Sequence, residues 1–322
     1  MLTEQSLVKV QVRRKKRLNR EVFLFDLFPL EGDTLPRFSA GAHIDVEAAP
    51  GIVRSYSLCN SASASDRYQI AVLREVSSRG GSAAMHDTIH EGDVIRISEP
   101  KNHFPLLPGR HQSLLLAGGI GVTPLLSMAG QLDLEGARFC MHYCTRSAEH
   151  AALREYIHQA SFANRVIFHA DDDDGGTPFD LGKVLASADS DAHLYVCGPP
   201  GFINTVCSTA KAAGWSQERI HFEAFSAEPQ SEPSSDFDVL IASSGVRVRV
   251  PSDLSIVQAL GKAGISVPVS CEQGVCGTCK TGLLDGVPDH RDLYLTDAEK
   301  DSNSHILLCC SRARSPSLVL DL

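Results

Sequence analysis

The first third of the chain alternates between apolar and polar residues in short segments. Examples are HIDVEA (43–48), YQIAVLREV (68–76) and DVIRIS (93–98), with turn-forming residues between them. A period of two places one side chain in a core and the next in solvent, as in a strand of an antiparallel sheet. Several short strands in succession are typical of a barrel, so we predict an antiparallel β-barrel over residues 1–107.

The middle of the chain has a different pattern, in which apolar runs alternate with helical ones. The apolar runs are SLLLAGG (113–119), RFCMHYC (138–144), RVIFHAD (165–171) and AHLYVCG (192–198). Helical patterns follow, such as those at 150–160 and 201–214. This alternation predicts an α/β domain with a doubly wound parallel sheet.

One stretch of the middle region needs a test as a membrane span, because no Asp, Glu, Lys or Arg occurs between Arg110 and Asp133. Four turn- or helix-breaking residues, Gly118, Gly119, Gly121 and Pro124, interrupt it. No continuous apolar segment of the ~18 residues that a span needs is left. We therefore expect a buried strand, a turn and a helix, and no membrane association.

Two segments divide the chain. The ten residues AEPQSEPSSD (227–236) contain two Pro and three Ser and read as a linker, and HFPLLPGRHQS (103–113) marks a softer boundary. We thus predict three domains, at 1–107, 108–226 and 237–322. A length of 322 residues agrees with two or three domains.

The net charge of −9 excludes a nucleic-acid-binding protein. One local exception is the basic run from Arg13 to Arg17, followed by Arg20. It is either a solvated turn between two strands or a docking patch for an acidic partner protein.

Ten cysteines are many for this length, and four of them form a pattern. CEQGVCGTC (271–279) gives C-x4-C-x2-C, and Cys309 follows after 29 further residues. This is the plant-type spacing of a [2Fe-2S] cluster, with Cys271, Cys276, Cys279 and Cys309 as ligands and Cys310 as a core thiol. Zinc or plain buried thiols are the alternatives. Since residues 1–20 contain no apolar leader, we expect a reducing, cytoplasmic environment.

The other cysteines look mainly structural. Cys140 and Cys144 lie two strand periods apart and should share a face, and Cys207 lies in a helical pattern. Cys59 and Cys197 lie close to possible cofactor motifs, so a functional role stays open for these two.

Two glycine turns follow predicted strands of the parallel sheet. They are AGGIGVTPLLSMA (117–129) and VCGPPGF (196–202). Such turns let a backbone approach a phosphate, and ligands bind at the carboxyl ends of parallel strands at a switch point. Either turn alone is equally compatible with tight packing.

The barrel region carries two further motifs. RSYSLCNS (54–61) brings together a cation, an aromatic ring and hydroxyls, and SSRGGSAAMHD (77–87) adds an Arg, two Gly and a Ser before a short helix. Flavin mononucleotide needs such parts for its phosphate and its ring, although either motif alone could be an ordinary barrel turn.

Together these motifs resemble the phthalate dioxygenase reductase family, over essentially the whole chain and in the family's domain order. DHRDLYLTDAEK (289–300) and ILLCCSRARSPSLVLDL (306–322) look especially like the family's C-terminus. The resemblance implies an FMN-binding barrel, an NAD-binding α/β domain and an α+β ferredoxin domain of the β-grasp type. It implies that NADH gives a hydride to FMN, and that single electrons then pass through the [2Fe-2S] cluster to a terminal Rieske non-haem iron oxygenase.

The resemblance also assigns site residues by motif. FMN would be held by Arg54, Tyr56, Ser57, Arg79, Gly80, Gly81 and Ser82. The NADH site would be lined by Gly119, Gly121, Thr123, Pro124, Cys197, Gly198 and Pro199. The catalytic positions would be Ser57, Cys197 and Phe225, the last as an aromatic residue near the flavin.

Some alternatives stay open. Arg146 and Arg154 could meet the 2′-phosphate of NADPH, whereas the acidic run DDDDGG (171–176) would disfavour it. The protein could instead be a stand-alone NAD(P)H oxidoreductase with another acceptor, such as a ferredoxin or a quinone. A non-catalytic electron carrier is a third possibility, against which the intact R-x-Y-S and GGS motifs argue.

Overall fold

The structure is a computed structural model of the full chain. It describes residues 7–30, 34–64, 66–75, 80–172, 179–225, 235–269, 274, 277–292 and 294–322. The chain divides into two compact units, Leu2–Glu223 and Ala224–Leu322, the second of which also includes Met1. The first unit contains the barrel and the parallel sheet, and each unit is described by itself.

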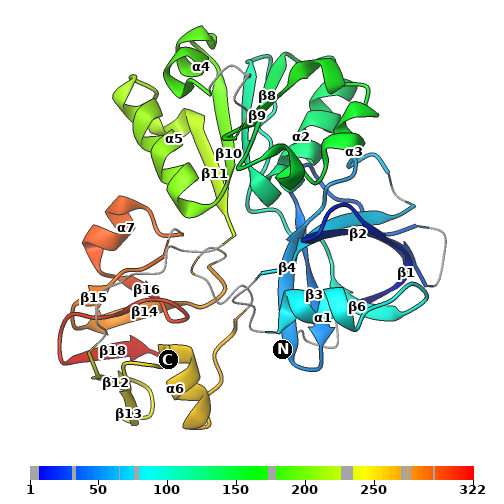
Figure 1. The fold of residues 1–322 in the computed structure, drawn as a ribbon. Coiled ribbons are helices and arrows are strands. Elements are labelled where there is room, and N and C mark those ends of the chain that lie inside the picture. The colour runs from blue at the N-terminus through cyan, green and yellow to red at the C-terminus, as the bar shows by residue number, and fades with distance from the viewer. Residues whose placement is uncertain are drawn as a thin grey trace. The chain divides into compact units, whose positions relative to one another are not determined.

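The N-terminal part of the first unit is a six-stranded antiparallel sheet in the order β4-β3-β6-β1-β2-β5 (Figure 1). Its strands are β1 (Leu7–Arg17), β2 (Val22–Pro29), β3 (His43–Ala49), β4 (Ile52–Ser57), β5 (Tyr68–Leu73) and β6 (Val94–Ser98). A bridge between Leu58 and Ile70 connects the two ends of this order, so the sheet nearly closes into a barrel. Helix α1 (Gly81–Asp87) follows β5.

Alternation along the strands explains the barrel. In β1, Val10 and Val12 are fully buried while Arg13 and Arg14 are exposed, on either side of a register shift between Val12 and Arg14. Buried side chains from β1, β2, β3, β5 and β6 form one apolar core, and Tyr56 of β4 packs against it. The antiparallel barrel predicted from the sequence is confirmed.

The second part of this unit is a five-stranded sheet in the order β11-β10-β7-β8-β9. Its strands are β7 (Ser113–Gly118), β8 (Phe139–Thr145), β9 (Val166–Ala170), β10 (His193–Gly198) and β11 (Ile220–Ala224). Its helices are α2 (Val122–Leu134), α3 (Arg154–His158), α4 (Leu181–Ser187) and α5 (Pro200–Ala212), with α2 and α5 on opposite sides of the sheet (Figure 1).

The chain order reverses between β7 and β10, which pair in parallel in the middle of this sheet. The run at 113–130 forms β7, a 3-10 turn (Gly119–Gly121) and most of α2, as predicted. Among the described residues, no helix is long and apolar enough to cross a membrane.

The C-terminal unit is a five-stranded mixed sheet in the order β13-β12-β18-β14-β16, with a separate pair formed by β15 and β17. Its strands are β12 (Phe237–Ile241), β13 (Arg247–Val250), β14 (Lys280–Asp285), β15 (Pro288–Asp289), β16 (His305–Leu307), β17 (Arg312–Ala313) and β18 (Ser317–Asp321), and its helices are α6 (Ile256–Lys262) and α7 (Asp297–Ser302). Both helices begin with a capping box, at Ser255 and Thr296.

The predicted fold class, a multidomain protein with a barrel, a doubly wound sheet and an α+β module, is confirmed. The residue boundaries at 107 and 226 stay predictions. Most of the predicted linker lies outside the described residues.

Candidate functional site

The C-terminal unit contains the predicted cluster ligands, of which the structure describes two. Cys279 is 3% exposed and Cys309 is 9% exposed, and both belong to the core of this unit. Cys271 and Cys276 lie outside the described residues. Among the described residues alone, no group of three or more metal-ligating side chains is present.

Gly274 and Gly277 of the cysteine motif each occupy a position where a larger side chain would clash with its surroundings. Gly274 and Gly277 have φ angles of +75° and +74°, in the left-handed region. A Cβ atom at Gly274 would lie 2.5 Å from the Cys310 sulfur, and one at Gly277 would lie 2.5 Å from a ring carbon of Tyr294. Buried thiols beside a loop that admits no larger side chains fit a [2Fe-2S] cluster.

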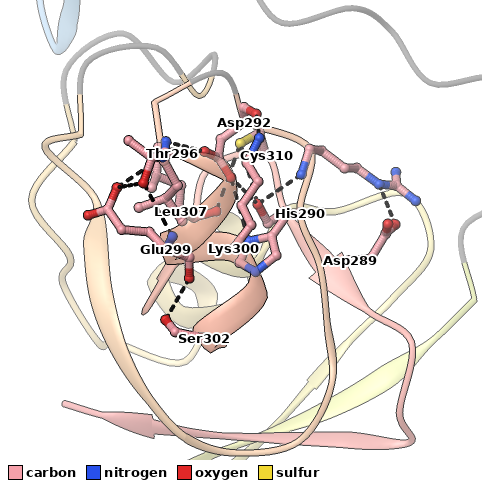
Figure 2. Close-up of polar contacts among 12 residues, drawn as sticks. Asp289, His290, Asp292, Thr296, Glu299, Lys300, Ser302, Leu307 and Cys310 are labelled. Carbon is pink, nitrogen blue, oxygen red and sulfur yellow. Dashed lines mark hydrogen bonds and ion pairs between the residues drawn. The ribbon is translucent and has the colours of Figure 1, made fainter. Parts of the chain in front are cut away.

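Cys310 is only partly buried, and it packs against the core to which Cys309 belongs. Its sulfur lies 3.9 Å from the main-chain oxygen of Leu307, and a Cβ atom at Gly274 would clash with it. Figure 2 shows Cys310 next to Asp292. The choice of Cys309 as the fourth ligand stays a prediction.

In the first unit, both glycine turns lie at the carboxyl ends of β7 and β10, at the switch point of the sheet. A Cβ at Gly121 would lie 2.5 Å from the amide nitrogen of Gly198, and one at Gly198 would lie 3.0 Å from the Cα of Gly118. The two backbones therefore touch, which only glycine permits. Thr123 is buried and donates its hydroxyl to the main-chain oxygen of Ile120, so it also shapes the first turn.

The barrel motifs lie together at β4 and α1. The Arg54 side chain lies across Gly81, where a Cβ would come 2.9 Å from the Arg54 Nε. Gly80 caps α1 with a φ of +93°, and the Ser82 hydroxyl accepts a hydrogen bond from the Glu75 amide. Arg79 lies outside the described residues.

The Tyr56 hydroxyl is buried and has no hydrogen-bond partner among the described residues. Burial also raises the pKa of this phenol. A buried hydroxyl without a partner is costly, and a bound flavin with several polar atoms would satisfy it. The arrangement of Arg54, Tyr56 and the 80–82 turn thus fits FMN.

Ser57, at the end of β4, approaches the α/β part of the unit. Its hydroxyl lies 3.5 Å from the carboxylate of Glu223 on β11. Burial of that carboxylate raises the pKa of Glu223 to about 8, so it keeps its proton at neutral pH. Burial, reinforced by the charge of Glu223, also raises the pKa of the Cys197 thiol well above its ordinary value.

The end of barrel strand β4 and the switch point of the parallel sheet are therefore neighbours, as the positions of Ser57, Cys197 and Glu223 show. Glu223 was not predicted from the sequence, because a single Glu in a strand carries no local signature. Phe225 directly follows β11 and belongs to the other compact unit, so its role stays a prediction.

The remaining cysteines are structural, as far as their contacts show. Cys59 is 1% exposed and donates to the main-chain oxygen of Gln69 inside the barrel. Cys140 and Cys144 are half-buried at positions of β8 that share a face, as predicted, and Cys207 lies in α5. Of the two open cases, only Cys197 lies at a candidate site.

The basic run forms the end of β1, so it is not a turn. Lys15 is tied down by two hydrogen bonds of 2.6 Å to the main-chain oxygens of His86 and Ile89. Arg13 lies over the ring of Phe28, while Arg14 and Lys16 are exposed. Arg154, one of the two candidates for a 2′-phosphate, packs over the ring of Phe168.

The chain is similar to known protein families and to individual proteins. Residues 239–314 match the 2Fe-2S iron-sulfur cluster binding domain family, and residues 100–220 match the N-terminal domain of the dimethylamine monooxygenase subunit DmmA-like family. The chain is 45% identical to vanillate O-demethylase oxidoreductase of Pseudomonas sp. (strain HR199 / DSM 7063), over 98% of this chain and 100% of that protein.

The chain is also similar to phthalate dioxygenase reductases, both in sequence and in structure. The chain is 39% identical to phthalate dioxygenase reductase of Burkholderia cepacia, over 99% of this chain and 98% of that protein. A solved phthalate dioxygenase reductase, described as a modular structure for electron transfer from pyridine nucleotides to [2Fe-2S], covers 99% of both chains with a TM-score of 0.80 and 39% identity.

The fold and the site define an iron-sulfur flavoprotein oxidoreductase that uses a pyridine nucleotide. The resemblance seen in the sequence is confirmed by relatives that align over nearly the full length. The chain belongs to the phthalate dioxygenase reductase family.

Proposed function

We propose that this protein is the reductase component of a two-component oxygenase, and that the oxygenase is of the Rieske non-haem iron type. It takes a hydride from NADH onto FMN and delivers single electrons through its [2Fe-2S] cluster. The relatives named above serve a demethylase and a dioxygenase, which supports an oxygenase as the acceptor. The expected location is the cytoplasm.

The main support for the proposal is that Glu223 lies beside both Ser57 and Cys197. Ser57 ends the strand of the FMN motif, and Cys197 precedes the second glycine turn. A flavin ring beside Ser57 would face a nicotinamide held by the turns at Gly121 and Gly198. When bound, FMN supplies the conversion of a two-electron donor into single electrons.

The chain's own residues position the two nucleotides. Arg54 and the Gly80–Ser82 turn hold the FMN phosphate, and Tyr56 gives its buried hydroxyl to the flavin. Glu223 holds a proton beside the Ser57 hydroxyl. Because its pKa is raised, the Cys197 thiol stays protonated and does not act as a nucleophile. Cys271, Cys276, Cys279 and Cys309 hold the cluster.

NADH is the proposed donor. Arg154 packs over the ring of Phe168, so a structural contact accounts for this arginine without a 2′-phosphate. We expect kcat/KM with NADH to exceed that with NADPH at least about tenfold, a difference of ~1.4 kcal/mol. Steady-state kinetics with both nucleotides measures this ratio, and equal values would contradict the choice of donor.

The acceptor is tested by anaerobic electron transfer. The purified protein and NADH are mixed with a purified Rieske-type vanillate demethylase oxygenase, and the absorption of the oxygenase is followed. The proposal predicts that the Rieske centre is reduced in the presence of the reductase and not with NADH alone. Reduction of a quinone or a diffusible ferredoxin, but of no Rieske oxygenase, would favour the stand-alone oxidoreductase.

A further inference from the structure

A buried carboxylate lies beside the cluster loop of the C-terminal unit. Asp292 is 3% exposed. Its carboxylate accepts a hydrogen bond of 2.7 Å from the Leu295 amide and lies 3.5 Å from the Ser311 hydroxyl. Figure 2 shows Asp292 next to Cys310 and to Lys300, whose ammonium donates to the Asp292 main-chain oxygen at 2.7 Å.

Asp292 touches both parts of the chain that carry the predicted ligands. A Cβ on Gly274, which lies between Cys271 and Cys276, would come 3.1 Å from the Cα of Asp292. Ser311 stands two residues after Cys309 in the sequence. A charge at Asp292 therefore lies in the immediate surroundings of the cluster.

His290 faces this carboxylate, and its ring is buried without hydrogen bonds to the described residues. Its side chain is 11% exposed, and its Nδ1 lies 3.6 Å from a carboxylate oxygen of Asp292. Both ring nitrogens are buried without a hydrogen-bond partner among the described residues. Buried polar atoms of a side chain normally form hydrogen bonds, and a position that serves packing alone is usually filled by an apolar residue. The buried His290 ring, whose two nitrogens form none with the described residues, therefore needs another explanation.

Two neighbouring arginines pair with another carboxylate: Arg291 donates to Asp289 at 2.7 Å, and Arg314 lies 3.6 Å from Asp289. Among the residues that the structure describes, no Lys or Arg side chain lies within ion-pair distance of the Asp292 carboxylate. The nitrogen-bearing side chains next to Asp292 are therefore His290, which faces the carboxylate, and Lys300, whose ammonium donates to the main-chain oxygen.

We propose that Asp292 and His290 tune the reduction potential of the [2Fe-2S] cluster, with the carboxylate lowering the potential and the His290 ring, which faces the carboxylate, offsetting part of that effect. The proposal rests on the presence of the cluster in the proposed function. A cluster that accepts one electron becomes more negative by one charge, and a fixed buried negative charge nearby opposes that change. No atom or proton is transferred between the two residues and the cluster.

The test is a redox titration of the full-length protein with its cofactors, followed by the spectroscopic signal of the cluster. Asp292→Asn should raise the potential and His290→Gln should lower it. Each change should alter the equilibrium constant for electron uptake about tenfold, which is about 59 mV for one electron.

The opposite signs separate a charge effect from a loosened structure. Asp292→Glu keeps the charge and should keep the wild-type potential. Asp238→Asn serves as the control, because this carboxylate on β12 belongs to the same unit and pairs with Arg247 and Arg249; it should shift the potential little. If Asp292→Asn does not retain the cluster, the reduction potentials of His290→Gln and Asp292→Glu test the proposal instead.

Shifts in the same direction for Asp292→Asn and His290→Gln, or no shift in either, would overturn the proposal. A wild-type protein without a cluster signal would refute the proposed function itself. A wild-type cluster with unshifted variants would refute only the role of this pair.

Discussion

In the C-terminal unit, three of the four predicted ligands come from one nine-residue segment and the fourth from a single later position. In the first unit, the candidate site comes from four distant positions: Ser57, Gly121, Cys197 and Glu223. A metal cluster requires side chains that bond to it directly, and a short loop can present them. A pair of nucleotides mainly requires room and backbone approach, which distant segments must create together.

The two regions should therefore respond differently to substitution. Loss of one ligand should remove the cluster completely, whereas a change in the first unit should weaken binding or shift a pH profile.

Cys309→Ser should abolish the cluster, while Cys310→Ser should retain it. Cys309 belongs to the buried core beside Cys279, and its spacing from Cys279 fits the plant-type pattern. Iron and sulfide content and visible absorption of the purified variants measure the result. Retention of the cluster by Cys309→Ser and its loss in Cys310→Ser would exchange the two assignments.

Gly121→Ala should destabilise the first unit by about 2 kcal/mol, as expected for overpacking, and should weaken reduction by NADH. The added methyl would meet the Cys197–Gly198 peptide, which cannot move without disturbing β10. Gly130→Ala is the matched control, since Gly130 lies in α2, the helix that Gly121 directly precedes, and the nearest neighbour of the added methyl would be 3.9 Å away.

The control should be neutral or stabilising by up to about 1 kcal/mol, because alanine favours a helix interior. Thermal unfolding and NADH affinity of both variants measure the difference. Equal effects of the two substitutions would show that the contact between the two turns does not matter.

Glu223→Gln should remove a pH dependence. The pKa of this carboxyl is raised from 4.5 to about 8, so its proton is lost only as the pH rises through about 8. If only the protonated form supports hydride transfer, flavin reduction by NADH falls about tenfold between about pH 7 and pH 9 in the wild type. The rate in Glu223→Gln should be nearly flat over this range, as measured by anaerobic stopped flow.

The free energy of unfolding should change with pH in the same direction as the rate of flavin reduction: both decrease as the pH rises. A carboxyl whose pKa is raised by folding stabilises the native state fully below its ordinary pKa, and this contribution is lost as the pH rises through about 8. An unchanged pH profile in Glu223→Gln would mean that another group titrates.

The smallest effect concerns the basic end of β1. Arg14→Glu combined with Lys16→Glu should change the KM for the oxygenase less than about twofold, since both side chains are exposed and far in sequence from the cluster ligands. NADH-driven turnover at low salt measures this. A large, salt-dependent rise in KM would instead support the basic run as a docking patch.

The sequence predicted the three folds and the cysteine motif because these leave local patterns, namely a period of two, alternating strands and helices, and a fixed spacing. It could not predict Glu223 or the pair formed by His290 and Asp292. Each is an isolated polar residue whose meaning depends on what the fold places opposite it, such as Ser57 or Gly274. It also predicted a possible turn at Arg13–Arg17, where the structure has a strand, because apolar and basic residues alternate there too weakly to decide.

We propose that two electrons from NADH enter at the first unit and leave one at a time through the second. An anaerobic titration of the purified protein with NADH, followed by visible absorption, tests this route of electron transfer. We expect a flavin band and an iron-sulfur shoulder that both bleach as NADH is added, and in Cys309→Ser only the flavin band should be present and bleach. Absence of both bands, or bands that NADH leaves unchanged, would contradict it.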